Sequence, residues 1–351
     1  MRTHRDNIAY QSTLNGIKRI VQDFRDLEEQ AIKEKYDITK ESEDSKVING
    51  IRNIKEFGIK EEFFREATYR PLDKRYTYFT NKSKGFIARP VYDTMRHLAH
   101  QDQSKNLGLI IGKSGNVVGD MPWNLCFVTS TIVDLNIFYR GGGYVYPLYV
   151  DTSKAVNQGN SSTQELGDEK ETIISNLNGD IIKQLAKCLG VEPSPEDLLD
   201  YNYAILHSSN YREKFKEQLK YQFPRIPYPR NEEEFKKIAS LGNHLRHLHL
   251  MDNTAAWNAK SLFPFKGNGS SIIVKPQWKD GKVYVNKENY YDNVPEEVWR
   301  YYIGGYQIAE KWLKDRKGTE LDFNAIIHYS NILYVLTKTI YLSKEIDKIY
   351  I

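Results

Sequence analysis

Apolar and polar residues alternate with a helical period over the first sixty positions. Apolar residues recur every three or four positions between residues 8 and 31, which predicts one amphipathic helix. Its apolar face consists of Leu14, Ile17, Ile20, Val21, Phe24, Leu27 and Ala31. A second helix is predicted over residues 46–57, and the charged segment between the two is a solvated connector. We expect these helices to form a hairpin that docks on another domain.

The pattern changes to strand-like alternation near residue 67. The segment ATYRPLDKRYTYF, residues 67–79, predicts a strand, a turn at Pro71 and Asp73, and a second strand. Further strands are predicted at residues 107–112, 124–130 and 144–150. Pro147 indicates that the last of these is an edge strand or is interrupted. One short helix is predicted at residues 91–100.

Helical patterns dominate the second half of the chain. The polar residues 151–167 predict a long surface loop before it. Helices are predicted at residues 181–189, 195–206, 210–221, 232–251 and 323–346. Ser194 is the expected N-cap of the second of these, with Pro195 at its first position. The segment FPRIPYPR from Phe223 must be extended, and Asp280-Gly281 predicts the turn of a β hairpin. The predicted fold class is α+β.

Composition and charge narrow the class of protein. The 351 residues are 40% hydrophobic and 27% charged, which is typical of a soluble globular protein. The formal net charge of +4 permits a polyanionic partner without demonstrating one. Cys126 and Cys188 are predicted to be buried thiols in a reducing cytosol. No apolar signal segment follows Met1 and no apolar run approaches about 20 residues, so we expect a cytoplasmic protein without a membrane span.

Two patterns could bind nucleotides or metals, and both are incomplete. Gly112-Lys113-Ser114 follows an apolar strand, but a phosphate-binding loop needs a glycine five positions earlier, where Leu107 stands. A cluster of histidines lies at His244, His247 and His249. It lacks the spacing and the glutamate of a zinc hydrolase. Weak metal binding by the first two histidines stays open, because they share a helix face.

Catalytic motifs for DNA chemistry are weak or missing. Asp280 and Lys282 have the spacing of some metal-dependent nucleases, as do Glu234 and Lys236 in a helical context. Asp-Gly is also the favoured hairpin turn, which would direct Asp280 to solvent. An amino-methyltransferase of DNA usually has an Asn/Asp-Pro-Pro-aromatic tetrapeptide that holds the flipped base. The chain contains no Pro-Pro pair and no glycine-rich loop for a methyl donor.

Basic residues and tyrosines are interleaved in the first β-rich stretch. Arginine can pair with guanine, and lysine or tyrosine can hold phosphates, so this composition favours DNA contact. Arg140 is a further candidate because Gly141, Gly142 and Gly143 after it would allow close backbone approach. The predicted DNA-contacting residues are Lys74, Arg75, Lys82, Lys84, Arg89, Arg96, Lys113 and Arg140. A solvated surface is the alternative for each residue taken singly.

Four blocks resemble the C-terminal half of the type ISP restriction–modification enzymes and the related type IIG enzymes. They are YRPLDKRYTYF from Tyr69, GGYVYPLYV from Gly142, DYNYAILHSSNYREKF from Asp200 together with FPRIPYP from Phe223, and VPEEVWRYYIGGYQIAEKWLKDRKG from Val294. The opening THRDNIAY is similar to the tail of that family's methyltransferase domain. The resemblance covers nearly the whole chain, and the last block is long and specific. Within that block, Tyr306, Trp312 and Leu313 are expected to be packing residues.

The resemblance implies that catalysis and DNA recognition are carried out by different domains. In that family a nuclease, a helicase-like motor and an adenine-N6 methyltransferase precede this region. The chain would then be a helical coupler, residues 1–60, and a target-recognition domain, residues 61–351, with a possible internal boundary at residues 151–170. This domain would have a β-rich recognition core with inserted helices and a helical C-terminal part. It would recognise double-stranded DNA for methyltransferase or restriction domains, in cis or in trans.

The same resemblance implies that the chain has no catalytic centre of its own. S-adenosylmethionine and Mg²⁺ are expected only in the absent catalytic domains. Two other functions stay open. One is a nuclease that uses Asp280 and Lys282. The other is a protein-interaction module that grips a methyltransferase or motor with its first two helices. For DNA recognition, we expect replacement of Arg75 or Arg89 by alanine to weaken DNA capture.

Overall fold

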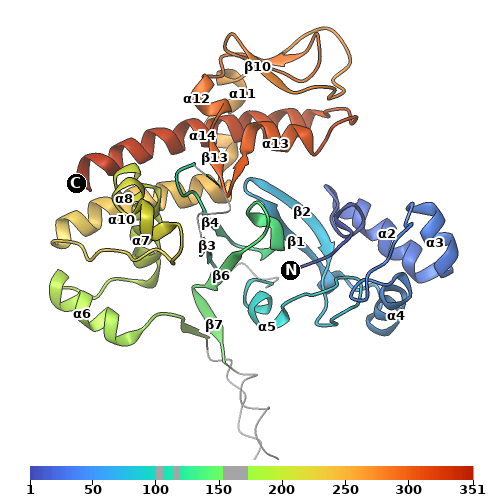
Figure 1. Ribbon diagram of the computed structural model, residues 1–351, viewed down its shortest axis with the longest axis horizontal. Helices are drawn as coiled ribbons and strands as arrows, with labels where there is room; N and C mark the ends of the chain where they lie inside the picture. The colour runs from blue at the N-terminus through green and yellow to red at the C-terminus, as the bar shows by residue number, and fades with distance from the viewer. Residues whose placement is uncertain (100–105, 114–118, 120, 153–172, 351) are drawn as a thin grey trace, which may run out of the picture.

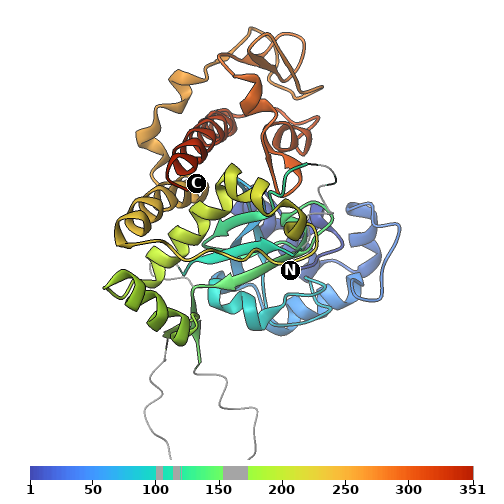
Figure 2. The same ribbon diagram turned by 60° about the vertical axis from the view of Figure 1, so that its left-hand side comes forward.

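The protein is an α+β structure in which strands lie between two helical parts (Figure 1). The computed structural model describes residues 1–99, 106–113, 119, 121–152 and 173–350. The N-terminal helices lie on one side of the central strands. The C-terminal helices, with a small sheet beyond them, lie on the other side, and a rotated view agrees (Figure 2). The predicted α+β class is therefore confirmed.

The N-terminal part consists of short helices that pack on one another and on the strands. They are α1 (Asp6–Ala9), α2 (Leu14–Asp26), α3 (Glu29–Lys35) and α4 (Val47–Phe57). The single helix predicted over residues 8–31 is divided, because Tyr10 and Leu27 have extended backbones at helix ends. The Thr13 hydroxyl accepts a backbone N–H and caps α2. The buried face of α2 contacts α4 and strand β2 (Asp73–Tyr78), so this predicted face is already occupied within the chain.

Two three-stranded sheets form the centre of the molecule. The first has the order β2-β1-β5 and the second the order β4-β3-β6. The other strands are β1 (Phe64–Arg70), β3 (Gly108–Gly112), β4 (Cys126–Thr129), β5 (Ile132–Val133) and β6 (Gly143–Pro147). All pairings in these sheets are antiparallel except that of β1 with β5. The Thr68 hydroxyl of β1 lies 2.7 Å from that of Thr129 in β4, which joins the two sheets.

The hairpin between β1 and β2 turns one residue earlier than predicted. Pro71 and Leu72 form the turn, and Leu72 has a φ of 61°. The prediction that Asp73 supplies the turn chemistry is wrong. Asp73 is the first residue of β2 and is only 3% exposed. Its carboxylate pairs with two arginines, which offsets the cost of burying the charge.

Strand β6 is an edge strand of the second sheet and ends at Pro147, as predicted from that proline. Strand β7 (Tyr149–Asp151) follows after an interruption at Leu148 and pairs with β8 (Ile173–Ser175). The short helix predicted before β3 is α5 (Tyr92–Met95), extended by one 3-10 turn. Strand β6 therefore ends at the proline, which has no N–H to donate to a further neighbouring strand.

A group of helices packs beside the second sheet. They are α6 (Gly179–Leu189), α7 (Pro195–His207), α8 (Ser209–Lys214), α9 (Lys216–Leu219) and α10 (Glu232–Leu250), and α7 and α10 contact β4. Ser194 caps α7 as predicted, and the helix predicted at residues 210–221 is divided into α8 and α9. Helices α7 and α10 cross closely, since a Cβ on Gly242 would lie 1.8 Å from the carbonyl oxygen of Asp200. Arg246 of α10 donates to the Asp200 carboxylate at 2.6 and 2.9 Å.

The C-terminal part combines a small sheet with the longest helix. Its elements are α11 (Ala259–Leu262), β9 (Phe265–Lys266), β10 (Gln277–Lys279), β11 (Lys282–Tyr284), β12 (Tyr290–Tyr291), α12 (Glu296–Trp299), β13 (Tyr302–Ile303), β14 (Tyr306–Gln307), α13 (Ile308–Lys314) and α14 (Phe323–Ile349). Asp280 and Gly281 form the predicted β10–β11 turn with φ values of 50° and 76°. Helix α14 contacts α7, α8, α10, α11, α12 and α13, so it organises this part.

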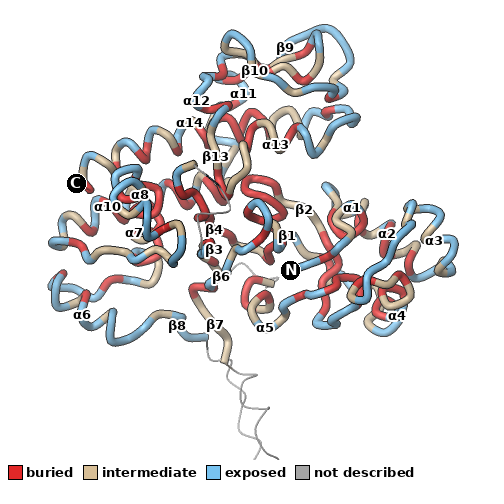
Figure 3. The backbone as a smooth tube through the Cα atoms, in the orientation of Figure 1, coloured by how far each residue is buried: buried red, intermediate tan, exposed pale blue. Residues whose placement is uncertain are grey.

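Buried residues run continuously from the central strands into the C-terminal helices (Figure 3). Trp312 and Leu313 are buried as predicted, whereas Tyr306 is half-buried. Cys126 is buried, but the prediction for Cys188 is wrong, because its side chain is exposed beside the carbonyl of Pro229. Among the described residues, no helix is long and apolar enough to cross a bilayer.

The proposed division at residue 60 stays a prediction. It would fall between α4, which ends at Phe57, and β1, which begins at Phe64. The possible boundary at residues 151–170 lies outside the described residues, apart from Asp151 and Thr152.

Candidate nucleic-acid interface

The eight predicted DNA-contacting residues lie at four places in the fold. Two are on β2, three are in the loop that follows it, one is next to α5, and two are at one end of the second sheet. In that order they are Lys74 and Arg75; Lys82, Lys84 and Arg89; Arg96; and Lys113 and Arg140. A carboxylate that already neutralises a cation competes with any DNA phosphate. The ionic partners therefore decide which of the eight are available to a polyanion.

Arg75 belongs to a buried ionic cluster. It donates to the Asp73 carboxylate at 3.0 Å, and Arg316, which follows α13, donates to the same carboxylate at 2.7 Å. The Arg75 guanidinium also lies 3.9 Å from the centre of the Tyr69 ring, and its side chain is 15% exposed. Burial alone would raise the pKa of Asp73, but Arg316 and Arg75 outweigh burial and lower that pKa to about 2. These surroundings favour a structural role for Arg75.

The three cations after β2 are exposed but paired. Lys82 lies 2.9 Å from Glu56 of α4, and Arg89 donates to Asp44 at 2.9 and 2.5 Å. Lys84 lies 3.9 Å from the same Asp44 carboxylate. Their side chains can reach solvent, so contact with DNA would require an exchange of partner. Such exposed pairs are weak, typically below about 1 kcal/mol, so the exchange costs little.

Arg96 and Lys74 hold parts of the fold together. Arg96 lies 3.3 Å from the Asp151 carboxylate and donates to its carbonyl oxygen at 2.9 Å, which ties α5 to β7. The ammonium group of Lys74 lies 3.5 Å from the carbonyl oxygen of Leu250 at the C-terminal end of α10. A cation is favourable at that position because the helix dipole is negative there.

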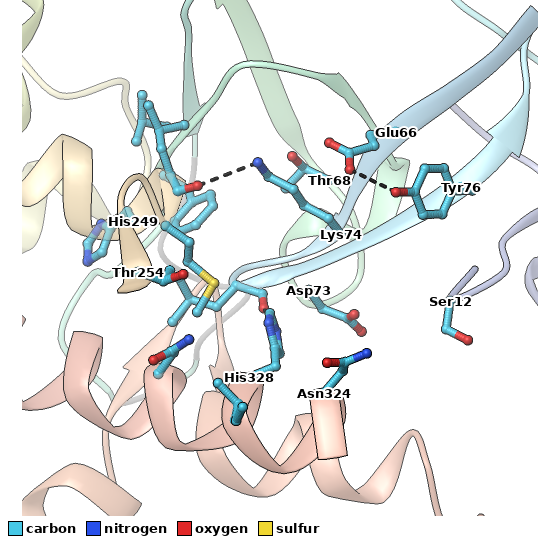
Figure 4. A pocket seen from close by; sticks show the side chains of 17 residues that line it. Ser12, Glu66, Thr68, Asp73, Lys74, Tyr76, His249, Thr254, Asn324 and His328 are labelled. Atoms are coloured by element: carbon cyan, nitrogen blue, oxygen red, sulfur yellow. Dashed lines mark hydrogen bonds between the residues drawn. The ribbon is translucent and has the colours of Figure 1, made fainter. Parts of the chain in front are cut away.

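Lys74 also lines a cavity of about 450 Å³ between β2, the end of α10 and α14 (Figure 4). Lys74 and Thr68 enter it from the strands, and Asn324 and His328 enter from α14. Burial lowers the pKa of His328, whose imidazole lies 3.1 Å from the carbonyl oxygen of Leu72. The cavity marks the junction between the hairpin and the C-terminal part.

Lys113 and Arg140 differ from the other predicted cations. Both side chains are exposed, and neither has an ion pair with any residue that the structure describes. Lys113 directly follows β3, and two residues separate Arg140 from the start of β6. Because Gly112 of β3 pairs with Gly143 of β6, both cations lie at the same end of the second sheet.

Three exposed tyrosines extend from this end of the sheet along its edge strand β6, with Tyr144 opposite Ile111 and Tyr146 opposite Leu109. The exposed fractions are 43% for Tyr139, 48% for Tyr144 and 43% for Tyr146. Tyr144 and Tyr146 are two residues apart on edge strand β6, so they share one face. The ring of Tyr144 packs edge-on against Phe223, with 5.1 Å between ring centres. We call Lys113, Tyr139, Arg140, Tyr144 and Tyr146 the sheet-end surface.

The segment that carries the sheet-end surface contains few carboxylates. Residues 107–150 include all five of its side chains and two carboxylates, those of Asp120 and Asp134. Asp120 lies outside the described residues, and the Asp134 carboxylate is buried and accepts a hydrogen bond from Arg70 at 2.6 Å. A cationic surface with exposed aromatic rings suits a polyanion with stacked bases. None of the three tyrosines was predicted to contact DNA; the alternation Tyr144-Val145-Tyr146 before Pro147 was a signal for two of them.

The histidine cluster gathers no metal site within the described part of the chain. His249 is buried, with Tyr203 at 2.5 Å from Nδ1 and Thr339 at 2.8 Å from Nε2. Burial, aided by Arg212, lowers the pKa of His249 to about 3, so its imidazole is neutral. His244 and His247 are exposed, and no group of three potential ligands is found among the described residues.

The residues of the nuclease alternative have hairpin roles. Asp280 is exposed at the left-handed first position of the β10–β11 turn, as the Asp-Gly pair predicts. Lys282 lies 4.6 Å from the centre of the Tyr290 ring. Glu234 accepts from Arg230 at 3.0 Å near the start of α10. No cluster of carboxylates surrounds these residues in the described part of the chain.

Comparison with known families gives a match over almost the entire chain. A sequence model of the type ISP C-terminal specificity domain matches residues 1–345. The chain belongs to this family. A search of curated protein sequences finds no match.

Solved structures share the fold of this specificity domain. The ATP-dependent type ISP restriction–modification enzyme LlaBIII bound to DNA has a TM-score of 0.68 at 17% identity, over 99% of this chain and 23% of that chain. The DrdV–DNA complex has a TM-score of 0.68 at 17% identity, over 98% and 35%. A nuclease-deletion mutant of the type ISP enzyme LlaGI, in complex with a DNA substrate mimic, has a TM-score of 0.61 at 17% identity, over 98% and 27%. The specificity domain thus spans at most about a third of these solved chains.

The block that most resembles the family has a packing role in this specificity domain. The Tyr306 hydroxyl donates to the carbonyl oxygen of Asn136 at 3.1 Å, and the Arg316 guanidinium stacks 3.8 Å from the Trp312 ring centre. Arg316 then reaches Asp73 of the β1–β2 hairpin. The block therefore fixes the C-terminal part on the central sheets.

Proposed function

We propose that this specificity domain recognises a short, asymmetric sequence in double-stranded DNA and presents its adenine to an adenine-N6 methyltransferase. The methyltransferase and any restriction activity would reside in other domains, in cis or in trans. Membership of the type ISP specificity-domain family is the observation that carries the proposal. Neighbouring structures described as bound to DNA support it.

The sheet-end surface is the best candidate for the contact with DNA. It combines three exposed aromatic rings with two cations that have no ion pair among the described residues. Lys113 suits a phosphate, because a lysine is a compact point charge on a flexible stem. The ion-paired Lys82, Lys84 and Arg89 remain candidates for further phosphate contacts, because their pairs are exposed and weak. Phosphate contacts would position the domain, and contacts with base edges would give the sequence preference.

The chemistry of the proposed system belongs outside this chain. S-adenosylmethionine would be bound by the methyltransferase domain, and Mg²⁺ by nuclease or motor domains. The present residues would supply neither a methyl-donor site nor a nuclease centre. A cytoplasmic location, where DNA and such partners are found, is part of the same proposal.

Selection from a randomised duplex pool tests the proposal directly. The 351-residue chain would be immobilised, incubated with the pool at low salt, and the retained DNA sequenced. We expect enrichment of one asymmetric site over the background, because specific complexes are typically about 10³-fold or more tighter than non-specific ones. Equal retention of all sequences would remove the claim of specificity.

The nuclease alternative needs a separate assay. Supercoiled plasmid would be incubated with the chain and Mg²⁺, and with an Asp280→Asn variant that keeps the favoured hairpin turn. We expect no cleavage by either protein. Cleavage by the wild type that the substitution abolishes would replace our proposal with a nuclease.

A further inference from the structure

The loop that carries Arg140 is fixed at several points. The N–H of Tyr139 donates to the carbonyl oxygen of Gly304 at 2.7 Å, and the N–H of Gly141 donates to that of Phe138 at 2.9 Å. Gly304 is itself held, because its N–H donates to the carbonyl oxygen of Asn124 at 2.8 Å. The backbone of residues 138–141 therefore has one defined path.

The glycine pair of the β13–β14 turn fits closely beneath this loop. Gly304 has a φ of 62°, and a Cβ there would lie 2.2 Å from the Phe138 ring. Gly305 has a φ of 79°, and its N–H donates to the side-chain oxygen of Asn124 at 2.9 Å. Only glycine combines this backbone with this contact. The Ile303-Gly304-Gly305-Tyr306 segment thus acts as a rigid support for the Arg140 loop.

The Arg140 side chain is exposed. Its guanidinium lies 5.3 Å from the Tyr139 ring centre and has no carboxylate partner among the described residues. Its own φ is 64°, a left-handed conformation that the loop imposes. Gly141 and Gly142 follow with φ values of 80° and 86°, and a Cβ on Gly142 would meet nothing within 4 Å. A large partner can therefore approach the backbone beside Arg140.

A fixed backbone is more useful for reading a base than for holding a phosphate. Phosphates line every duplex, and a flexible side chain can follow them. Base edges require hydrogen bonds in one geometry, which depends on a supported side chain. Resting on the proposed function of DNA recognition, we propose that Arg140 reads one guanine of the target, donating to its O6 and N7 atoms in the major groove.

The size of the loop selects the major groove. The minor groove of B-DNA is about 6 Å wide, and the major groove about 12 Å. The Arg140 guanidinium lies 5.3 Å from the ring centre of Tyr139, which packs edge-on against Tyr306 at 5.9 Å, so a groove that admits Arg140 must leave room for this ring at its edge. The wider groove accepts this pair without opening, and a planar guanidinium matches the two acceptors of guanine. Lys113, at the same end of the sheet, would contact a phosphate beside the groove.

Base selection with variants of the full chain tests this role. The wild type should select guanine at one position, and both Arg140→Ala and Arg140→Lys should lose that preference while keeping the others. Arg140→Ala should bind the selected site about tenfold more weakly, the usual value of a bidentate arginine–guanine pair. Arg300→Ala is the matched control, since it removes an exposed arginine that is paired with Glu296 and is not among the predicted DNA-contacting residues. It should leave the preference unchanged at every position.

Base analogues test the groove. Replacing that guanine by 7-deazaguanine removes the N7 acceptor, whereas replacing it by inosine removes only the amino group of the minor groove. The wild type should lose about threefold with the first analogue, which removes one of the two acceptors, and little with the second. Arg140→Ala should show no further loss with 7-deazaguanine, because the contact with N7 is already lost with the arginine.

The outcomes separate this inference from the proposed function. If Arg140→Ala weakens all sequences equally, or if inosine rather than 7-deazaguanine reduces binding, the assignment to a guanine in the major groove is wrong, although DNA recognition stands. If the wild type selects no site, both proposals fail. A selected site whose preferences are all unchanged in Arg140→Ala would also overturn the assignment.

Discussion

At the scale of single residues, the partner of a charge decides its role. Arg75 and Arg140 are both arginines beside a tyrosine ring, with guanidinium-to-ring distances of 3.9 and 5.3 Å. Arg75 is 15% exposed and bound to Asp73, whereas Arg140 is exposed without an ion pair among the described residues. The first therefore stabilises the fold, and the second is available to a ligand.

Asp73 gives a prediction about stability. Asp73→Asn should lower the free energy of unfolding at pH 7 by about 3 kcal/mol, because Arg75 and Arg316 lose their buried carboxylate. Urea unfolding followed by tryptophan fluorescence measures this change. Asp280→Asn is the control, since it makes the same chemical change in an exposed turn that also accepts asparagine. A loss no larger than that of the control would contradict the role of the cluster.

The Asp73 carboxylate should also make the free energy of unfolding depend on pH. The pKa of Asp73 is lowered from 3.8 to about 2 in the folded protein. Its contribution is therefore fully present above the unfolded pKa, and it is lost as the pH falls through about 2. The wild type should lose about 2 kcal/mol more than Asp73→Asn between pH 6 and pH 2. Equal losses in urea titrations over this range would show that the carboxylate is not stabilised by its arginines.

At the scale of elements, close crossings and tight turns hold the sheets in place. Helices α7 and α10 meet at Gly242, and α10 contacts β4 of the second sheet. The β13–β14 turn meets the loop before β6 at Gly304. The first contact positions two helices that pack beside β4, and the second fixes the loop that leads into β6.

Gly242→Ala tests the helix crossing. The new Cβ would lie 1.8 Å from the carbonyl oxygen of Asp200, so the helices must separate. We expect the free energy of unfolding to fall by about 3 kcal/mol, at the upper end of overpacking effects. Gly179→Ala in α6 is the control, because a Cβ there meets nothing within 4 Å, and it should be neutral or slightly stabilising. Similar urea midpoints for both variants would contradict the close crossing.

At the scale of the whole molecule, positive charges are nearly balanced by negative ones. The chain has 50 lysines and arginines against 46 aspartates and glutamates. Five of the eight predicted DNA-contacting residues pair with carboxylates within the fold. DNA binding should therefore rely on few phosphate contacts.

The salt dependence of binding tests this balance. We expect the logarithm of the binding constant to fall with the logarithm of salt concentration with a slope of about −2 to −4, which corresponds to about two to four phosphates. Fluorescence anisotropy with the selected duplex measures the slope, and Lys113→Ala should make it shallower by about one. A slope steeper than about −6 would mean that the ion-paired cations exchange their partners for DNA.

Local patterns determined much of the fold. The Ser194-Pro195 start of α7, the Asp280-Gly281 turn and the apolar face of α2 were predictable, because capping, turn geometry and periodicity depend on neighbouring residues. The family resemblance rested on blocks such as the one from Val294, and the family match confirms it. The placement of Asp73 and Cys188 was mispredicted, because burial depends on contacts that sequence neighbours do not reveal.

The candidate interface was decided by the tertiary structure. From the sequence alone, the eight cations were equally good candidates for DNA contact, because a sequence does not show which of them has an ionic partner. Folding brought Asp44, Glu56, Asp73 and Asp151 to five of them. It also brought Gly304 beneath Phe138, 166 positions earlier in the numbering of the chain. Electrostatic interactions act through space rather than along the chain, so only the folded structure separates a stabilising charge from one available to bind.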